Sequence, residues 1–121
     1  MSLVLGVGLR AGTPYPELRD LVGDALEDIG GTVVLVVTRA GRENEHALRQ
    51  LVEELGAELR VMTTEQLAEQ SVPSPSAQVE LLTGTASVAE AAVLALNAQL
   101  VVQKLRSEHA AVAVGLLSHP G

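Results

Sequence analysis

The chain of 121 residues contains no cysteine, tryptophan or phenylalanine, and Tyr15 is its one aromatic residue. Without cysteine there is no disulfide framework, no thiolate metal site and no cysteine nucleophile. Basic residues are also few, with 8 Lys and Arg against 15 Asp and Glu, which gives a net charge of −7. General nucleic-acid binding uses a basic patch and often stacking rings. The composition therefore argues against a nucleic-acid-binding protein.

Long apolar runs and targeting signals are missing too. Every apolar stretch is interrupted before about 18 residues, the length that a membrane span needs. The first five residues lack the basic region and long apolar segment of a signal peptide. With 47% hydrophobic and 19% charged residues, the chain is too apolar to be disordered. We therefore expect a single globular domain over residues 1–121, in the cytoplasm and without membrane contact.

Strand and helix patterns alternate in the first half of the chain. Buried-strand patterns at Leu3–Val7 and Thr32–Thr38 are each followed by apolar residues at helical spacing, over 18–29 and 47–55. Leu59–Met62 is typical of a third strand. This order predicts a parallel βαβαβ unit with two crossover connections.

The second half follows a different pattern. Residues 71–76 contain two prolines, which exclude a central strand, and a short strand is expected at Val79–Leu82. Ser87–Asn97 is typical of a helix that is apolar on every side, so it is buried all round, either in the molecule or under a partner. Leu100–Leu105 and Ala110–Leu117 predict a closing β-hairpin. Together the patterns predict an α/β fold, a three-layer α/β/α sandwich with a mixed sheet.

A glycine-rich segment, Gly6–Thr13, joins the first strand to the first helix. Gly8 and Gly12 stand where the backbone must turn tightly or approach a ligand. Thr13 is predicted to be the N-cap, with Pro14 at the first helical position. Such a helix start offers free N–H groups to an anion. A well-capped turn that binds nothing is an equally simple interpretation.

The same segment satisfies a relaxed dinucleotide-binding fingerprint, Gly6-x-Gly8-x-x-Ala11. Arg39 follows the second strand, where an NADP-binding protein would place a cation. A lone match of this kind is a weak indication. The chain also has too little predicted parallel sheet for a full dinucleotide fold, because the parallel pattern is followed by a hairpin.

Positive charge is concentrated near the ends of the predicted strands. Five of the eight basic residues lie there: Arg10, Arg39, Arg42, Lys104 and Arg106. Open α/β sheets bind ligands beyond the carboxyl ends of their strands, which favours a ligand site at this edge. The alternative is that charged residues are simply easiest to solvate in loops.

A second glycine-led helix start follows at Gly84 and Thr85. Ser87 and Glu90 have the spacing of a capping box, in which each side chain satisfies a backbone donor of the other. That structural interpretation explains Glu90 fully. As a helix start, the segment is also a candidate for ligand contacts.

The histidines and the acidic helix residues give weaker signals. His46, His109 and His119 lack the spacing of a metal motif, so we interpret them as surface residues and predict no metal site. The glutamates at 43, 45, 53 and 54 are typical of a solvated helix face.

Several motifs together resemble one family, CobE and the C-terminal domain of CbiG from cobalamin (vitamin B12) biosynthesis. The segments that carry the resemblance are Gly6–Thr13, Arg42–Leu48, Ser71–Ser76, Gly84–Ala92 and Lys104. The resemblance implies an α/β domain that, in longer CbiG proteins, follows another domain and belongs to cobalt-precorrin-5A hydrolase, which opens a lactone and releases acetaldehyde. Because this chain starts directly on its first strand, we expect the preceding domain to be absent and do not carry the hydrolase activity across.

The resemblance also bears on individual residues. The family positions kept are Arg10, Gly12, Thr13, Glu45, Ser87, Glu90 and Lys104. The departures are Leu9, Arg42, Asn44, Ala47 and Gln103, where cysteine, lysine, aspartate, glycine and proline are expected. Without a carboxylate at Asn44, paired-carboxylate catalysis is weakened, and Glu45 is left as a polar contact or a lone base.

The leading functional hypothesis is a domain that binds a precorrin or corrinoid intermediate, or helps to process it, without a cofactor. The candidate ligand-binding residues are Gly8, Arg10, Gly12, Thr13, Arg39, Glu45, Gly84, Thr85, Ser87, Glu90 and Lys104. Cations and helix starts would meet the carboxylates of such a ring, and aliphatic side chains its apolar body. The alternative is an interaction module that forms a homodimer or docks on a cobalamin-pathway enzyme through the helix at 87–97. An NADP-binding domain ranks third.

Overall fold

The computed structural model describes residues 2–27, 29–63, 65, 89, 92–93, 96 and 98–117. Its strands are β1 (Ser2–Leu9), β2 (Thr32–Arg39), β3 (Glu58–Met62), β4 (Gln99–Arg106) and β5 (Ala110–Leu116). Its two full helices are α1 (Tyr15–Leu26) and α2 (His46–Leu55). Within these ranges, no helix is long and apolar enough to cross a membrane.

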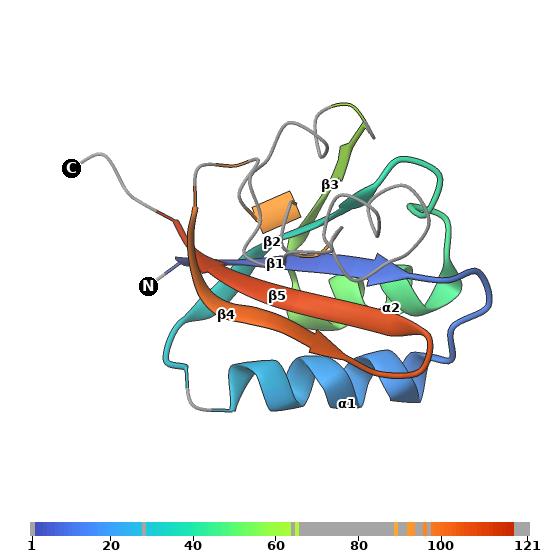
Figure 1. Cartoon of the computed structure of the whole chain (residues 1–121), viewed down its shortest axis with the longest axis horizontal. Helices are drawn as coiled ribbons and strands as arrows, with labels where there is room; N and C mark the ends of the chain where they lie inside the picture. The colour runs from blue at the N-terminus through green and yellow to red at the C-terminus, as the bar shows by residue number, and fades with distance from the viewer. Residues whose placement is uncertain are drawn as a thin grey trace.

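The described strands form one mixed sheet in the order β3-β2-β1-β5-β4 (Figure 1). β1, β2 and β3 are parallel, whereas β5 pairs antiparallel with both β1 and β4. The parallel unit and the closing hairpin predicted from the sequence are therefore confirmed. Because β4 and β1 both run opposite to β5, their carboxyl ends lie at the same edge of the sheet.

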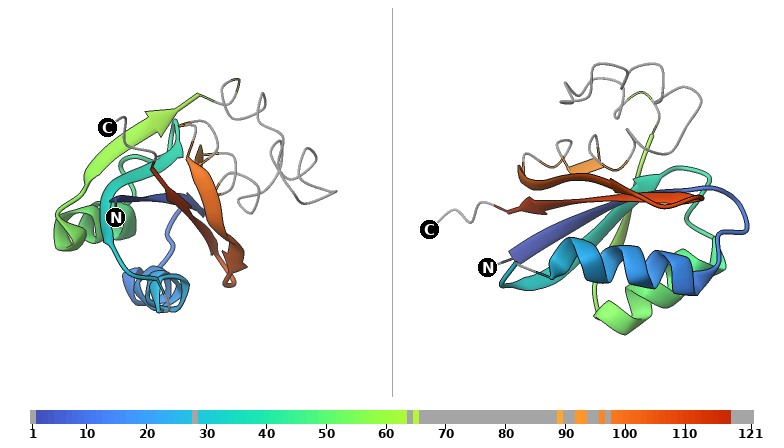
Figure 2. Two further views of the ribbon diagram at one scale, coloured as in Figure 1. Left: turned by 90° about the vertical axis from the view of Figure 1, so that its left-hand side faces the viewer. Right: turned by 60° about the horizontal axis from the view of Figure 1, so that its bottom comes forward.

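The two faces of the sheet carry two separate apolar clusters. Alternate residues of β1, from Leu3 to Leu9, pack with α1 and α2, as the period of two in a strand dictates. On the other face, Val4 packs with the helical residues Ala89, Ala92 and Val93, which are fully buried. Figure 2 shows α1 and α2 on one side of the sheet and the described part of residues 89–93 on the other. The three-layer sandwich is confirmed.

Glycine in the sheet allows the third layer to approach closely. A Cβ atom on Gly6 would overlap the backbone oxygen of Ala89, and one on Gly115 would overlap the side chain of Val93. These glycines lie on neighbouring strands, β1 and β5, under the same helical segment. Their role is close packing of helix against sheet.

This packing corrects the predicted start of the first loop. The sequence predicted a turn from Gly6 onward, but β1 continues to Leu9, and Gly8 is buried in the strand opposite Ala111. Because Gly6 and Gly8 serve the strand, they form no phosphate-binding turn. The dinucleotide interpretation of their spacing is therefore wrong.

Several sequence predictions lie outside the described residues. They are the proline loop at 71–76, the strand at 79–82, and the candidates Gly84, Thr85, Ser87, Glu90 and His119. Lys104 is placed by its backbone, near the carboxyl end of β4.

Candidate functional site

Three loops meet at the edge of the sheet where β1, β2 and β4 end. They are the β1–α1 loop (10–14), the β2–α2 loop (40–45) and the β4–β5 turn (107–109), and we call this region the strand-end edge. The Arg10 backbone N–H donates to the His109 carbonyl at 2.9 Å, which joins the first loop to the turn. Arg39 and Arg106, the last residues of β2 and β4, lie at the same edge. The structure thus brings together the strand-end cations that the sequence identified.

Thr13 is not the N-cap of α1. The N-cap is Pro14, without a side-chain cap hydrogen bond, and the helix begins at Tyr15. The Thr13 hydroxyl instead donates to the Arg10 carbonyl at 2.7 Å and lies 3.3 Å from the His109 carbonyl. Thr13 is buried, and the Arg10 carbonyl satisfies its one hydroxyl donor. Its role is to hold the β1–α1 loop against the β4–β5 turn.

The structure brings Glu45 and Gly12 together, and the two residues form a hydrogen bond with each other. The Glu45 carboxylate accepts the Gly12 N–H at 2.8 Å and so links the β1–α1 and β2–α2 loops. An amide bonded to a carboxylate of the protein is not free for an anionic ligand. The proposed anion site at this amide is therefore already filled by Glu45.

The arginines of the edge differ in how they are used. Arg42 Nε donates to the Leu9 carbonyl at 3.0 Å, which satisfies an acceptor at the end of β1. The guanidinium groups of Arg10 and Arg39 make no hydrogen bond or ion pair with another described residue. Arg10 is exposed and Arg39 is half-buried. Within the described part of the chain, these two cations are left for a ligand.

A cluster that the sequence analysis missed lies beside Arg10. Glu17, in the first turn of α1, accepts hydrogen bonds from the Ser107 hydroxyl and from the His109 backbone N–H at 2.7 Å. Its other oxygen lies 2.8 Å from His109 Nδ1. The bonds from Ser107 and His109 lower the pKa of Glu17 to about 2, and the bond to Glu17 raises the pKa of His109. No local spacing signals this cluster, because 92 residues separate Glu17 from His109.

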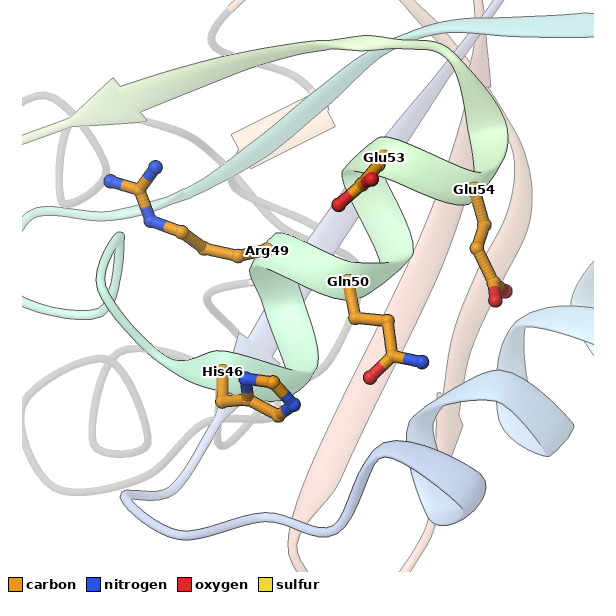
Figure 3. Close-up of a pocket in the computed structure, with 5 residues that line it drawn as sticks. All are labelled: His46, Arg49, Gln50, Glu53 and Glu54. Atoms are coloured by element: carbon orange, nitrogen blue, oxygen red, sulfur yellow. The ribbon is translucent and has the colours of Figure 1, made fainter.

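A shallow hollow of about 540 Å³ lies along α2 (Figure 3). Its lining residues all belong to α2: His46, Arg49, Gln50, Glu53 and Glu54. The charges are mixed, and one helix alone supplies every lining side chain. It includes none of the strand-end cations, so we place the candidate site at the loops.

The fold and this edge define an α/β/α domain with a polar, partly cationic site at the carboxyl ends of its strands. The chain belongs to the family of the cobalamin synthesis G C-terminus, whose model matches residues 3–115. The resemblance drawn from the sequence motifs is thus confirmed, and the family is one of cobalamin biosynthesis.

Two solved structures are similar over nearly their whole length. CobE, a protein from the cobalamin (vitamin B12) biosynthetic pathway, is 28% identical with a TM-score of 0.75, over 98% of this chain and 92% of that one. The cobalamin biosynthesis protein chiG from Agrobacterium tumefaciens is 26% identical with a TM-score of 0.69, over 97% and 99%. No curated protein sequence matches the chain.

Proposed function

We propose that this domain binds a precorrin or corrinoid intermediate of cobalamin biosynthesis at the strand-end edge. The observation that carries the proposal is the exposed guanidinium of Arg10, which lies in the family motif loop and has no partner among the described residues. An arginine fork without a carboxylate of its own is suited to grip a carboxylate of a ligand at two points. Membership in a cobalamin-biosynthesis family supports a corrin precursor as the class of ligand.

The chemistry of the edge fits such a ligand. Corrin precursors carry acetate and propionate carboxylates around a broad apolar ring. Arg10 directly follows β1, and Arg39 ends the neighbouring strand β2, so the two supply cations side by side along the sheet. Tyr15, the one aromatic residue, donates a hydrogen bond from its hydroxyl to Glu54, between α1 and α2. With so few aromatic rings in the chain, we expect the ring of the ligand to pack on aliphatic groups rather than to stack on an aromatic side chain.

The packing of the third layer supports ligand binding over docking. The apolar helix predicted at 87–97 suggested a partner only if its faces had no cover within the molecule. Its described residues Ala89, Ala92 and Val93 are buried against the chain's own sheet. The described part of this helix therefore gives no reason to expect a partner there, which weakens the docking alternative.

The test is to add hydrogenobyrinic acid, and then a panel of precorrins, to the purified protein. Binding should shift the visible spectrum of the pigment and make the pigment co-elute with the protein. Free pigment that elutes separately for every intermediate, at protein concentrations well above micromolar, would contradict the proposal and favour the interaction module.

A further inference from the structure

The imidazole of His109 is held in one orientation by α1. Glu17 lies 2.8 Å from Nδ1 and also accepts the backbone N–H of the same histidine. The Ser107 hydroxyl donates to this carboxylate as well. Because an ionised carboxylate can only accept, the proton of a neutral His109 lies on Nδ1. The Nε2 atom is therefore the one that changes when His109 gains or loses a proton.

The Nε2 side of the ring is open. The Glu108 carboxylate lies 4.0 Å from Nε2, and that side chain is 83% exposed. The His109 side chain is itself 40% exposed. When protonated, Nε2 is thus a hydrogen-bond donor that a ligand can reach.

Arg10 is a backbone neighbour of His109. Its backbone N–H bonds the His109 carbonyl, and its positive charge opposes the upward shift in the pKa of His109. Arg10 forms no ion pair with a described residue. An anion that approached both groups would relieve their mutual repulsion and be attracted by each.

We propose that Arg10 and protonated His109 together hold one carboxylate of the ligand, with Nε2–H as the second donor beside the guanidinium. This inference rests on the proposed function and names two residues that grip the ligand. Glu17 is a positioning residue, because it orients the ring and raises the pKa of His109.

The charges around His109 give the sign of the pH dependence. Glu17 from α1 and Glu108 from the turn raise the pKa of His109, and Arg10 from the β1–α1 loop lowers it. A bound carboxylate raises it further, so binding takes up a proton. Affinity should be greatest below the pKa of the free protein and fall as pH rises through it, by up to about tenfold per pH unit.

The experiment measures the affinity for hydrogenobyrinic acid across the neutral and mildly alkaline range, where the ligand carboxylates stay ionised. We expect the wild type to lose affinity with rising pH and to take up protons in calorimetry run in two buffers of different ionisation enthalpy. His109→Gln should bind weakly with a flat pH profile. His46→Gln, an exposed histidine of α2, should behave as the wild type.

A matched pair of carboxylate variants tests the positioning role of Glu17. Followed by NMR, Glu17→Gln should lower the pKa of His109 and move the binding profile to lower pH. Glu108→Gln, in the exposed part of the same turn, should move both much less. A purely structural Glu17 would lower the melting temperature and leave the binding profile in place.

Two results would overturn the inference in distinguishable ways. If hydrogenobyrinic acid binds tightly with the same pH-independent affinity to wild type and His109→Gln, the assignment of His109 to the ligand carboxylate is wrong and the proposed function stands. If no pigment of the panel binds at any pH, the proposed function and the grip both fall.

Discussion

At the scale of single residues, the polar groups of the strand-end edge fall into two sets. Glu45, Arg42 and Thr13 bond backbone groups of Gly12, Leu9 and Arg10, at 2.8, 3.0 and 2.7 Å. Arg10 and Arg39 bond no other described side chain. We therefore expect substitutions in the first set to change stability, and substitutions in the second set to change binding.

Arg10→Ala should weaken the binding of hydrogenobyrinic acid by about 1.5–3 kcal/mol, the range for hydrogen bonds to charged groups. Its melting temperature should change little, because exposed substitutions without partners usually stay within about 0.5 kcal/mol. Arg10→Lys should recover part of the affinity, since lysine offers a point charge and no fork. Titration and thermal unfolding of the same variants measure both quantities.

The control for Arg10 is Arg19→Ala, which removes an exposed arginine of α1 paired with Asp20 and should leave affinity unchanged. If Arg10→Ala lowered the melting temperature by several degrees with unaltered affinity, Arg10 would belong to the fold and not to the site.

Glu45→Gln should destabilise the domain without any ligand present. The carboxylate accepts the Gly12 N–H across two loops, and an amide oxygen is a weaker acceptor in that bond. Because the bond is exposed, we expect a loss of about 0.5–1.5 kcal/mol in the free energy of unfolding. Denaturant unfolding measures it, and Glu53→Gln, on the exposed side of α2, is the control. Equal stability of the two variants would show that the loop link contributes nothing.

At this scale, the sequence identified the strand-end cations but not the partners of each residue. The cap predicted at Thr13 follows from local preference, and it fails because carbonyl groups of Arg10 and His109 offer a better partner in space. His109 was interpreted as a surface histidine because Glu17 is distant in sequence. Contacts of this kind depend on how the hairpin docks on α1, which no local pattern encodes.

At the scale of the elements, close packing of the third layer on β1 gives the next prediction. Gly6→Ala should destabilise the domain by about 1–3 kcal/mol, as overpacking does, because the new methyl group overlaps the Ala89 backbone. Gly23→Ala is the matched control in α1, where a Cβ meets nothing within 4 Å. That change should stabilise by about 0.5–1 kcal/mol through helix propensity. A stable Gly6→Ala protein would show that the helical segment does not press on the sheet.

The stability that the Glu17–His109 contact provides between α1 and the β4–β5 turn should depend on pH (Figure 1). The pKa of Glu17 is lowered to about 2 from 4.5, so its stabilisation is complete above pH 4.5 and is lost as pH falls toward 2. The pKa of His109 is raised from 6.5, so its share is complete below pH 6.5 and is lost as pH rises through the raised value. The pair therefore contributes most between these limits.

Thermal unfolding of wild type and Glu17→Gln across pH measures this contribution. The gap between the two melting temperatures should be widest between pH 4.5 and 6.5 and narrow on both sides. A gap that does not change with pH would mean that the tie acts through hydrogen bonds alone.

The order of the elements was predictable because each pattern reports burial directly. The continuous apolar pattern of β1 and the β-branched run of β2 arise from strands that pack against both layers. The strand boundary at Leu9 was missed because glycine usually marks turns, whereas Gly8 here lies within the strand, opposite Ala111.

At the scale of the whole molecule, the net charge of −7 opposes an anionic ligand at long range. Screening limits that repulsion to roughly 8 Å at physiological salt, so contacts at the edge decide whether a ligand binds. Arg10 and Arg39, which pair with no described residue, supply the local attraction. The acidic residues of the same edge are partly neutralised by backbone N–H groups, as Glu45 is by Gly12.

If the domain binds a ligand rather than docking on a partner, it should be monomeric at high concentration, with a light-scattering mass near 12.6 kDa. Among the described residues, the exposed large apolar side chains are Val34, Val61 and Val101, between 37% and 43% exposed. Val34 and Val61 lie on β2 and β3, whereas Val101 lies on β4 at the other edge of the sheet, so they form no continuous patch of the size that dimers bury. Val101→Glu should leave the mass unchanged. A dimeric mass that this variant abolishes would identify the β4 edge as an interface and favour the interaction module over the ligand-binding domain.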